Sequence, residues 1–342
     1  MTTALAVIAP GLGVTVQDLG RPGFQAIGVP PGGALDPVTL RLANWLTGNA
    51  EGEGALEMRF SGPSFELHGG EAHLAVAGEG AWIELMPPYE GRYPAFRSVM
   101  MKPGQRFRVA IKGGGPCYLA VEGGFAIPPV LGSLSTLAVA RLGGFHGRAL
   151  AMGDVLPLRL AAPDLPGEQA LRPPKFASAP AIRVMLGPQD THFTPEGLST
   201  FLGEPFAISH LSDRMGLRLE GKAVEHAGSF DLISDGNAHG AIQVPGSGQP
   251  IVLMADRGTT GGYPKIATVI GADLPLLGRL PPGAELRFKA VTQTEAVEAL
   301  LAQDAMLASL KASIAPYRDP GEELARALLE ENIISGVADA QS

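Results

Sequence analysis

Short apolar runs separated by turn residues recur along the whole chain. The runs are rich in Val, Ile, Leu and Phe, and glycine and proline stand between them. The 342 residues include 46 glycines and 30 prolines, which leaves few stretches for long helices. Because apolar runs with tight turns are typical of short strands, the pattern predicts a mainly β protein with a few peripheral helices.

Four segments carry helix signals instead. Residues 36–48 begin with Asp36 and Pro37, a capping residue and a first-turn residue, and end in a glycine. Residues 194–203 repeat that arrangement with Thr-Pro at the start. A third helix is expected from residue 294, where leucines recur at helical spacing, and a fourth from residue 319 in the acidic C-terminal segment.

A Pro- and Ala-rich stretch and a faint internal repeat indicate two similar halves. The stretch at 161–180 has no apolar period and is typical of a linker. Residues 116–125 and 250–263 each contain an apolar strand that leads to Gly-Gly-aromatic, although chance likeness of two β segments is an alternative. We expect β-barrel-like domains at 1–165 and 181–290, a linker at 166–180, and C-terminal helices at 291–342.

Charge and cysteine content disfavour certain binding partners and an oxidising compartment. The formal net charge is −8 and no run of Lys or Arg occurs, which disfavours nucleic acid and anionic membranes as partners. The one cysteine, Cys117, lies in the apolar run PCYLAV, so we expect a buried thiol and no intrachain disulfide. Without a signal-peptide pattern or an 18-residue apolar run, the expected compartment is the cytoplasm.

Two near-matches to cofactor motifs fail on inspection, and metal binding has little support. The segment GLRLEGK at 216–222 has the spacing of a phosphate loop, but Ala223 stands where a hydroxyl should bind Mg²⁺. Lys102 in VMMKPG lacks the Ala-Met-Lys-Met context of a biotinylated lysine, so any biotin must be carried on another chain. The seven histidines are scattered and there is no cysteine cluster, so no metal is expected.

The segment with the most chemical content contains the apolar strand at residues 250–255 and the polar loop that follows it. It reads QVPGSGQPIVLMADRGTTGGYPKI over 243–266 and combines both charge signs, hydroxyls, a phenol and glycines. Polar loops on rigid strands often carry binding groups, and a solvated salt-bridge loop is the alternative. The candidate site residues in this segment are Gln243, Asp256, Arg257, Thr259, Thr260, Gly261, Gly262, Tyr263 and Lys265.

Two further polar clusters are candidates for the same cleft. One is SDRMGLRLEG with Ser212, Asp213 and Arg214, and the other is TVQDLGRPGFQ with Asp18 and Arg21. An exposed Asp–Arg pair of little energetic value is the alternative for the first cluster. We include all five residues as predicted substrate-binding residues.

Together these segments resemble the biotin-dependent carboxyltransferase family that contains the C subunit of bacterial ATP-dependent 5-oxoprolinase. The KipA-like half of the urea carboxylase carboxyltransferase domain, also found in urea amidolyase, belongs to the same family. Further matching stretches are GVPPGGALD, LEMRFSGPSFEL, VLGSLSTLAVARLGGFHGRALAMGD and GPQDTHFT, and the set covers about residues 10 to 290 in the same order. Departures are Leu217 for Tyr, Lys222 for Pro and His239 for Pro, and they leave the choice of substrate open.

The resemblance implies a fold, a partner and an activity. The implied fold is two tandem cyclophilin-like β-barrels. The implied partners are a KipI-like subunit, which completes a composite site, and a lactam-hydrolysing subunit. The implied reaction is ATP-dependent opening of 5-oxoproline to glutamate, so the substrate is a small amide or ureido compound. On this basis Lys265, Arg257 and Arg214 would stabilise negative charge, and Asp256 and Tyr263 would orient the substrate N–H or move a proton.

Two other functions remain open at this stage. Carboxyltransferase relatives move a carboxyl group from carboxybiotin to a urea-like acceptor, so the chain could be a component of a urea or guanidine carboxylase. KipA-like relatives also act as antagonists of a kinase inhibitor, in which case the Gly-rich loop would be a docking surface without catalysis.

Overall fold

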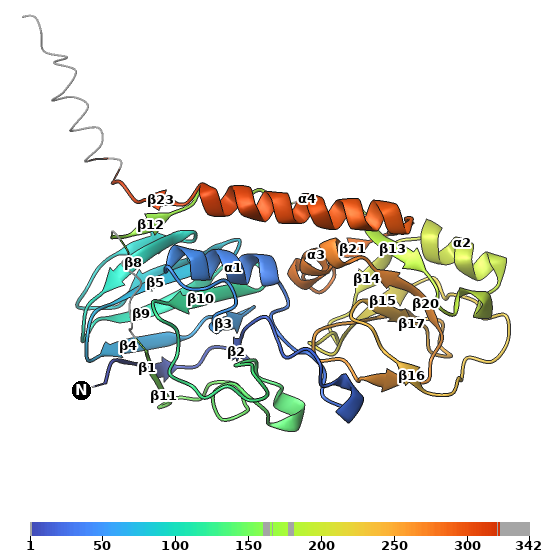
Figure 1. Cartoon of the computed structure of the whole chain (residues 1–342), viewed down its shortest axis with the longest axis horizontal. Coiled ribbons are helices and arrows are strands. Elements are labelled where there is room, and N and C mark those ends of the chain that lie inside the picture. The colour runs from blue at the N-terminus through green and yellow to red at the C-terminus, as the bar shows by residue number, and fades with distance from the viewer. Residues whose placement is uncertain (1, 160–164, 166, 177–180, 320, 322–342) are drawn as a thin grey trace, which may run out of the picture.

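The computed structural model describes residues 2–159, 165, 167–176, 181–319 and 321. With 31% of residues in strands and 19% in helices, the protein is mainly β, as the sequence predicts. The strands form two barrel-like units that lie side by side, and one long helix crosses both of them (Figure 1). In the described part of the chain, no helix is both long and apolar enough to cross a membrane.

The first unit consists of two antiparallel sheets packed against each other. One sheet has the order β11 (Val155–Pro157), β1 (Ala4–Ala9), β4 (Ser64–His68), β9 (Arg106–Ile111), β6 (Ala81–Leu85) and β7 (Arg92–Pro94). The other has the order β2 (Thr15–Gln17), β3 (Ala55–Met58), β10 (Cys117–Val121), β5 (Ala72–Ala77), β8 (Arg97–Met101), β12 (Gln169–Ala170) and β23 (Ala315–Pro316).

Alternation along β10 shows why these sheets pack as they do. Cys117, Leu119 and Val121 point into the core between the two sheets. Tyr118 and Ala120 point to the opposite face, where they join the cluster around the first helix. Burial raises the pKa of the Cys117 thiol to about 12, so this cysteine is the inert apolar residue that the sequence predicts.

Helix α1 (Pro37–Leu46) covers this opposite face of the second sheet. It begins as predicted, because the Asp36 carboxylate accepts hydrogen bonds from the N–H groups of Val38 and Thr39. Helix α2 (Pro195–Gly203) is capped in the same way by Thr194. Helix α3 (Leu274–Arg279) has only six residues and was not predicted. The predicted fourth helix from residue 319 falls almost wholly outside the described residues.

The second unit is a nearly closed barrel. Its eight strands have the order β21 (Glu285–Leu286), β14 (Phe206–Ile208), β15 (Gly216–Gly221), β18 (Ile251–Leu253), β17 (Ala241–Gln243), β20 (Lys265–Val269), β13 (Ile182–Leu186) and β22 (Phe288–Ala290). Only Arg287 separates β21 from β22, and these two strands pair with opposite edges of the sheet, which brings the edges together. A small ribbon of β16 (Asp235–Gly236) and β19 (Thr260–Gly261) lies beside it.

The long helix α4 (Gln293–Ala312) contacts both units, and the described residues also form four short 3-10 turns. α4 follows the second barrel, its Leu307 packs in the cluster around α1, and the chain then enters β23 in a sheet of the first unit. Figure 1 shows α4 lying across both barrels. The 3-10 turns are η1 (Gln25–Ile27), η2 (Ala138–Ala140), η3 (Asp190–His192) and η4 (Gly271–Asp273).

Domain boundaries stay a proposal in this arrangement. The eight-stranded barrel uses only residues 182–290, which fits the proposed second domain. The predicted linker, however, contributes β12 to the first unit, and its residues 166 and 177–180 lie outside the described residues.

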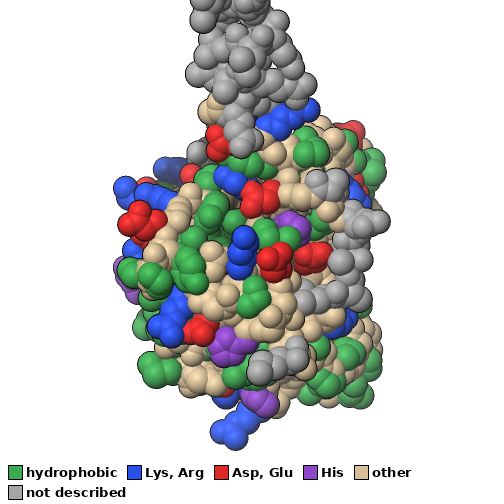
Figure 2. Space-filling view, turned by 90° about the vertical axis from the view of Figure 1, so that its left-hand side faces the viewer, with side chains coloured by type: hydrophobic (Ala, Val, Ile, Leu, Met, Phe, Trp, Pro, Cys, Tyr) green, Lys and Arg blue, Asp and Glu red, His purple; other side chains and the backbone are tan. Residues whose placement is uncertain are grey.

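Figure 2, which views the first barrel end-on, shows basic and acidic side chains beside one another on that face. Mixed charges of this kind do not make a basic binding surface there.

Candidate functional site

The Gly-rich segment forms a strand, a loop and a second strand, and it contains most of the predicted site. Strand β18 ends at Leu253, and Asp256 and Arg257 follow it with 8% and 4% of their surface exposed. The loop then turns through β19 and returns as β20, which starts at Lys265. Strand β17 pairs with both β18 and β20 and places Gln243 opposite Lys265. The loop is therefore anchored on three adjacent strands.

Lys265 is the most unusual residue of this loop. Only 2% of its surface is exposed, and its Nζ atom has no hydrogen-bond partner among the described residues. The nearest carboxylate is Asp235, with Nζ and Oδ2 3.7 Å apart, and that side chain is 65% exposed. A buried ammonium group without a hydrogen bond is costly, so it calls for an acceptor from outside this chain.

Asn237 organises the loop, and sequence reasoning did not find it. Its side-chain Nδ2 donates to the Gly258 carbonyl at 3.0 Å, and its Oδ1 accepts from Gln243 Nε2 at 3.3 Å. Its backbone N–H donates to the Thr259 carbonyl, and its own carbonyl accepts from Arg257 Nε at 3.1 Å. The only signal in the sequence was the turn-forming composition of SDGNAHG around it.

Gly261 needs to be a glycine because it passes close to this amide pair. A Cβ atom at this position would overlap the Gln243 amide and lie 3.0 Å from Asn237 Nδ2. The glycine thus lets the loop lie on Gln243 and Asn237. Thr260 and Tyr263 are exposed, and Thr259 and Gly262 are half-buried.

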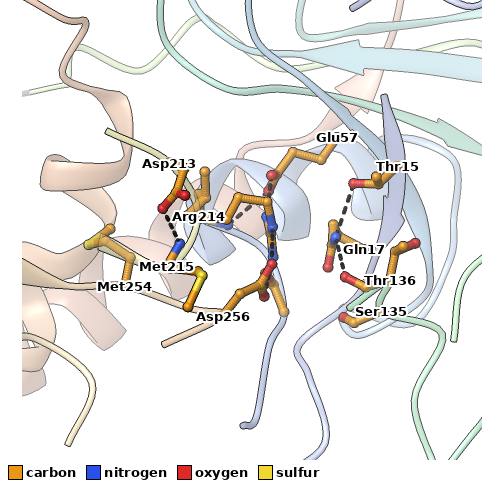
Figure 3. Close-up of polar contacts among 12 residues, drawn as sticks. Thr15, Gln17, Glu57, Ser135, Thr136, Asp213, Arg214, Met215, Met254 and Asp256 are labelled. Atoms are coloured by element: carbon orange, nitrogen blue, oxygen red, sulfur yellow. Dashed lines mark hydrogen bonds and ion pairs between the residues drawn. The ribbon is translucent and has the colours of Figure 1, made fainter. Parts of the chain in front are cut away.

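Arg214 joins the two barrels at the centre of the site. It precedes β15 in the second barrel, and its Nε and Nη2 donate to the Asp256 carboxylate at 2.8 and 3.1 Å. Its Nη1 donates to Glu57 on β3 of the first barrel, and its Nη2 also reaches the Gly33 carbonyl at 2.6 Å. Figure 3 shows Arg214 between the two carboxylates.

The contact of Arg214 with Asp256, Glu57 and Gly33, called the seam below, joins the two barrels. The charges in this seam shift one another's pKa values. Burial by itself would lower the pKa of the Arg214 guanidinium, but the nearby Glu57 and Asp256 charges outweigh it and raise that pKa. Burial raises the pKa of Asp256, and Arg214 opposes this rise. Arg214 therefore stays charged while it holds two buried carboxylates.

A second layer fixes Glu57, which sequence reasoning also missed. The Tyr118 hydroxyl donates to Glu57 Oε2 at 2.7 Å, and the Leu35 N–H donates to the same oxygen at 2.8 Å. Asp36, which caps α1, accepts from Arg279 of the second barrel at 2.8 Å. Glu57 lies in the family-like stretch LEMRFSGPSFEL, but nothing in that stretch identifies its partner, which is 157 residues away.

Asp18 and Arg21 approach the seam from the first barrel. The Asp18 carboxylate accepts hydrogen bonds from the Gly20 and Leu134 N–H groups and from the Ser133 and Ser135 hydroxyls, so its oxygens are saturated by this chain. Arg21 is 1% exposed and donates to two carbonyls of the loop at 130–135.

The remaining amino group of Arg21 faces the seam. Its Nη1 has no partner among the described residues. A Cβ atom built on Gly32 would lie 3.4 Å from this Nη1 and 3.6 Å from Asp256 Oδ1. Gly32 therefore leaves room between a free guanidinium nitrogen and a carboxylate of the opposite barrel.

Comparison with known proteins now identifies the family. A family model described as "Carboxyltransferase domain, subdomain A and B" matches residues 27–290. The chain belongs to this carboxyltransferase family. The C subunit of 5-oxoprolinase from Escherichia coli is 38% identical over 296 residues, which cover 86% of this chain and 94% of that protein.

Members of the carboxyltransferase family in urea enzymes are similar over a smaller part of their length. Urea amidolyase of Lachancea kluyveri is 33% identical over 334 residues, which cover 90% of this chain and 18% of that protein. The crystal structure of the K. lactis urea amidolyase superposes with a TM-score of 0.82 at 30% identity, over 93% of this chain and 21% of that chain. The chain thus spans about a fifth of these urea enzymes.

In this carboxyltransferase-family chain, two predicted residues shape a turn and do not reach the Gly-rich loop. The Ser212 hydroxyl bonds to both backbone groups of Arg218, and Asp213 Oδ1 accepts from the Met215 and Gly216 N–H groups. Both contacts fix the turn that presents Arg214. The rejected phosphate-loop match, 216–222, contains strand β15, in agreement with its rejection.

His239 lies close enough to Arg257 and Arg214 for their charges to act on its imidazole. Burial, with help from the Arg257 and Arg214 charges, lowers the pKa of its imidazole to about 4. Its Nε2 is buried and has no partner among the described residues. The imidazole is therefore neutral at physiological pH. Across the described residues, no group of three or more His, Cys, Asp or Glu side chains is arranged to hold a metal ion.

Proposed function

We propose that this chain is one component of an ATP-dependent 5-oxoprolinase-type enzyme that opens 5-oxoproline to glutamate. In this proposal it works in the cytoplasm with two partners, of which one is KipI-like and the other hydrolyses the lactam. The length of the match supports this choice over the urea enzymes, since the chain covers 94% of the E. coli 5-oxoprolinase C subunit. The urea amidolyases, by contrast, contain much more than this unit.

The observation that carries the proposal is the buried ammonium of Lys265, which has no hydrogen-bond acceptor among the described residues and only the exposed Asp235 as a 3.7 Å ion-pair partner. Opening a lactam breaks its ring C–N bond, adds the oxygen of water to the carbonyl carbon and adds a proton to the ring nitrogen. Negative charge develops on the carbonyl oxygen on the way, and a fixed cation in a buried site lowers that barrier. Lys265 is placed to be that cation once substrate supplies the acceptor.

The other predicted residues take roles that follow from their contacts. Arg257 and Gln243 hold Asn237 and the glycines, so in this proposal they fix the loop. Arg214 is fully engaged with Glu57, Asp256 and Gly33 and acts as a positioning residue. Asp256 and Tyr263 remain the proposed groups for the substrate N–H. Arg21 offers its free Nη1 to the substrate carboxylate.

ATP, when bound, would supply the free energy for ring opening, and we assign no phosphate loop for it to the described residues of this chain. The segment with that spacing contains a β-strand, in which backbone N–H groups bond to neighbouring strands and cannot surround a phosphate. We therefore assign the phosphate contacts mainly to the partners. This chain's own residues would bind and orient the lactam and stabilise its carbonyl oxygen.

A biotin-dependent urea-type carboxyltransferase is the second candidate, and the superposition on the K. lactis urea amidolyase favours it. Biotin carried on another chain would supply an activated carboxyl group. The unpaired donors Lys265 Nζ and Arg21 Nη1 suit a carboxylate or a ureido oxygen equally well. The site chemistry therefore fits both reactions. Assays with the two substrates, 5-oxoproline and urea, are needed to distinguish them.

A reconstitution experiment tests the proposed function. The full chain, the KipI-like partner, and both together with the lactam-hydrolysing partner are each assayed for ATP-dependent formation of glutamate from 5-oxoproline. We expect turnover only in the assembled enzyme. Turnover by this chain alone would contradict the composite site. Carboxylation of urea with carboxybiotin, without glutamate formation, would favour the second candidate, and a tight complex inactive in both assays would favour a regulatory protein.

A further inference from the structure

A long loop between β10 and β11 lines an open pocket that the proposed reaction does not use. The cavity has a volume of about 480 Å³, which is in the range of small-molecule sites. Its walls are mainly apolar and include Ile127, Val130, Phe145 and Pro157. Two basic residues, Arg141 and His146, complete the lining.

The backbone of this loop is held in a strained conformation. Four non-glycine residues of the described chain have a left-handed φ, and three of them, Leu131, Arg141 and His146, lie in this loop. Arg141 has φ 50° and His146 has φ 59°. Side chains other than glycine rarely adopt this conformation, and it persists where the surrounding structure enforces it. Both basic side chains that line the cavity are thus presented at a conformational cost.

Donors in the cavity wall lack acceptors. Arg141 is exposed, and its side chain makes no hydrogen bond or ion pair with any residue in the described ranges. The backbone N–H groups of Gly143, Phe145 and His146 likewise donate to no described residue. Successive N–H groups in a turn that mixes left- and right-handed residues form a concavity suited to an anion.

The charges of the residues around the pocket favour a ligand with a single negative charge. Arg141 contributes one full positive charge, and the nearby Asp154 is neutralised by Arg148 through contacts of 2.7 and 2.8 Å. The Phe145 and His146 rings, 4.2 Å apart, form an edge-to-face pair beside the cavity. A dianionic phosphate would find one cation there, whereas a carboxylate matches the planar guanidinium.

We propose that this cavity binds a small organic monocarboxylate, with the carboxylate on Arg141 and the loop N–H groups and its ring or short apolar chain against Phe145 and Ile127. The site is distinct from Lys265 but adjoins Arg21, because Arg21 donates to the Val130 and Ser135 carbonyls of the same loop. Occupancy would hold those carbonyls in place and thereby fix Arg21. The proposal does not depend on the reaction that the assembled enzyme catalyses.

The test is a titration of the full chain with benzoate, a monocarboxylate on a flat apolar ring, followed by the imidazole NMR signal of His146. Benzamide is the uncharged counterpart, and orthophosphate tests the alternative anion. We expect saturable binding of benzoate, at least tenfold weaker binding of benzamide, and no competition by orthophosphate. The absence of a saturable shift, or equal binding of benzamide or orthophosphate, would overturn the proposal.

Variants locate the site. Arg141→Gln should weaken benzoate binding about tenfold or more, while Arg148→Gln, a basic neighbour that does not line the cavity, should keep it. Arg141→Gly should also abolish binding but should not lower Tm, because glycine relieves the left-handed strain. Leu131→Gly, with φ 52° in the same loop and outside the lining, should keep binding and Tm. Loss of benzoate binding in Lys265→Met, with wild-type binding in Arg141→Gln, would place the ligand at the other site.

Discussion

Two cationic residues of this site differ in how far the chain itself matches their charge: the half-buried Arg214 and the buried Lys265. Arg214 meets two carboxylates and a carbonyl, so its charge is matched within the chain. Lys265 has no hydrogen-bond partner among the described residues and only a 3.7 Å ion pair with the exposed Asp235, so we propose that its charge serves a ligand. Burial alone does not separate a structural cation from a functional one, whereas the count of partners does.

Removing the matched charge should cost stability. Arg214→Met leaves Glu57 and Asp256 buried without their shared cation, and breaking such a pair costs about 3–5 kcal/mol. The measurement is urea unfolding of the full chain. Arg218→Met, an exposed arginine on β15, is the control and should change the free energy of unfolding by less than about 0.5 kcal/mol. Equal losses for the two variants would mean that the seam contributes no specific stability.

The thiol of Cys117 should be protected and pH-sensitive. Its pKa is raised to about 12 in the folded chain from an ordinary value of 9.0, so the folded state holds a proton that the unfolded state releases. The thiol thus stabilises the fold below about pH 9, and this contribution declines as the pH rises from about 9 toward 12. The difference in unfolding free energy between the wild type and Cys117→Ala should shrink over that interval. Rapid alkylation of the native protein at neutral pH would contradict the burial.

At the scale of elements, capping signals predicted two helices, since Asp36-Pro37 and Thr194-Pro195 begin α1 and α2. Leucine spacing predicted α4 from residue 294, and the structure starts it one residue earlier, after a capping box of Thr292 and Glu295 that sequence reasoning did not use. Helix α3 was missed because its six residues offer little more than one turn of apolar spacing. The short strands and the Gly-rich loop were likewise predicted from the local sequence.

The ion pairs across the seam between the barrels could not be predicted from the sequence. Glu57 and Arg214 are 157 positions apart, and Arg279 lies 243 positions from Asp36. Nothing local marks which distant charges will meet, since that depends on how the two units dock. The resemblance supplied the family, and the structure adds the contacts between the units.

The way α4 crosses both barrels yields a prediction for that element. Leu307 is buried against α1, so Leu307→Ala should destabilise the chain by about 2–5 kcal/mol. Leu301, which is 63% exposed on the same helix, is the matched position for Leu301→Ala, with an expected change below about 0.5 kcal/mol. Thermal unfolding monitored by circular dichroism distinguishes them. Similar Tm values for the two variants would show that the helix does not hold the units together.

At the scale of the whole molecule, the two barrels meet along a seam where polar groups of both converge. Arg21 and Glu57 come from the first unit, and Asp256 and Arg214 come from the second. A site with donors still unpaired in the described chain fits a protein that works with partners, and the C subunit of 5-oxoprolinase is similar along almost its whole length. The central claim is that the buried ammonium of Lys265 serves the substrate of the assembled enzyme.

The most direct measurement is kcat of the assembled enzyme with Lys265→Met, next to Lys289→Met as an exposed control on β22. Methionine keeps the apolar stem and removes the charge, so folding and partner binding should persist. We expect Lys265→Met to lower kcat about 10²-fold or more, the scale seen when a charge-stabilising group is lost, and Lys289→Met to leave kcat unchanged. Equal kcat for Lys265→Met and wild type, with intact assembly and stability, would contradict the account.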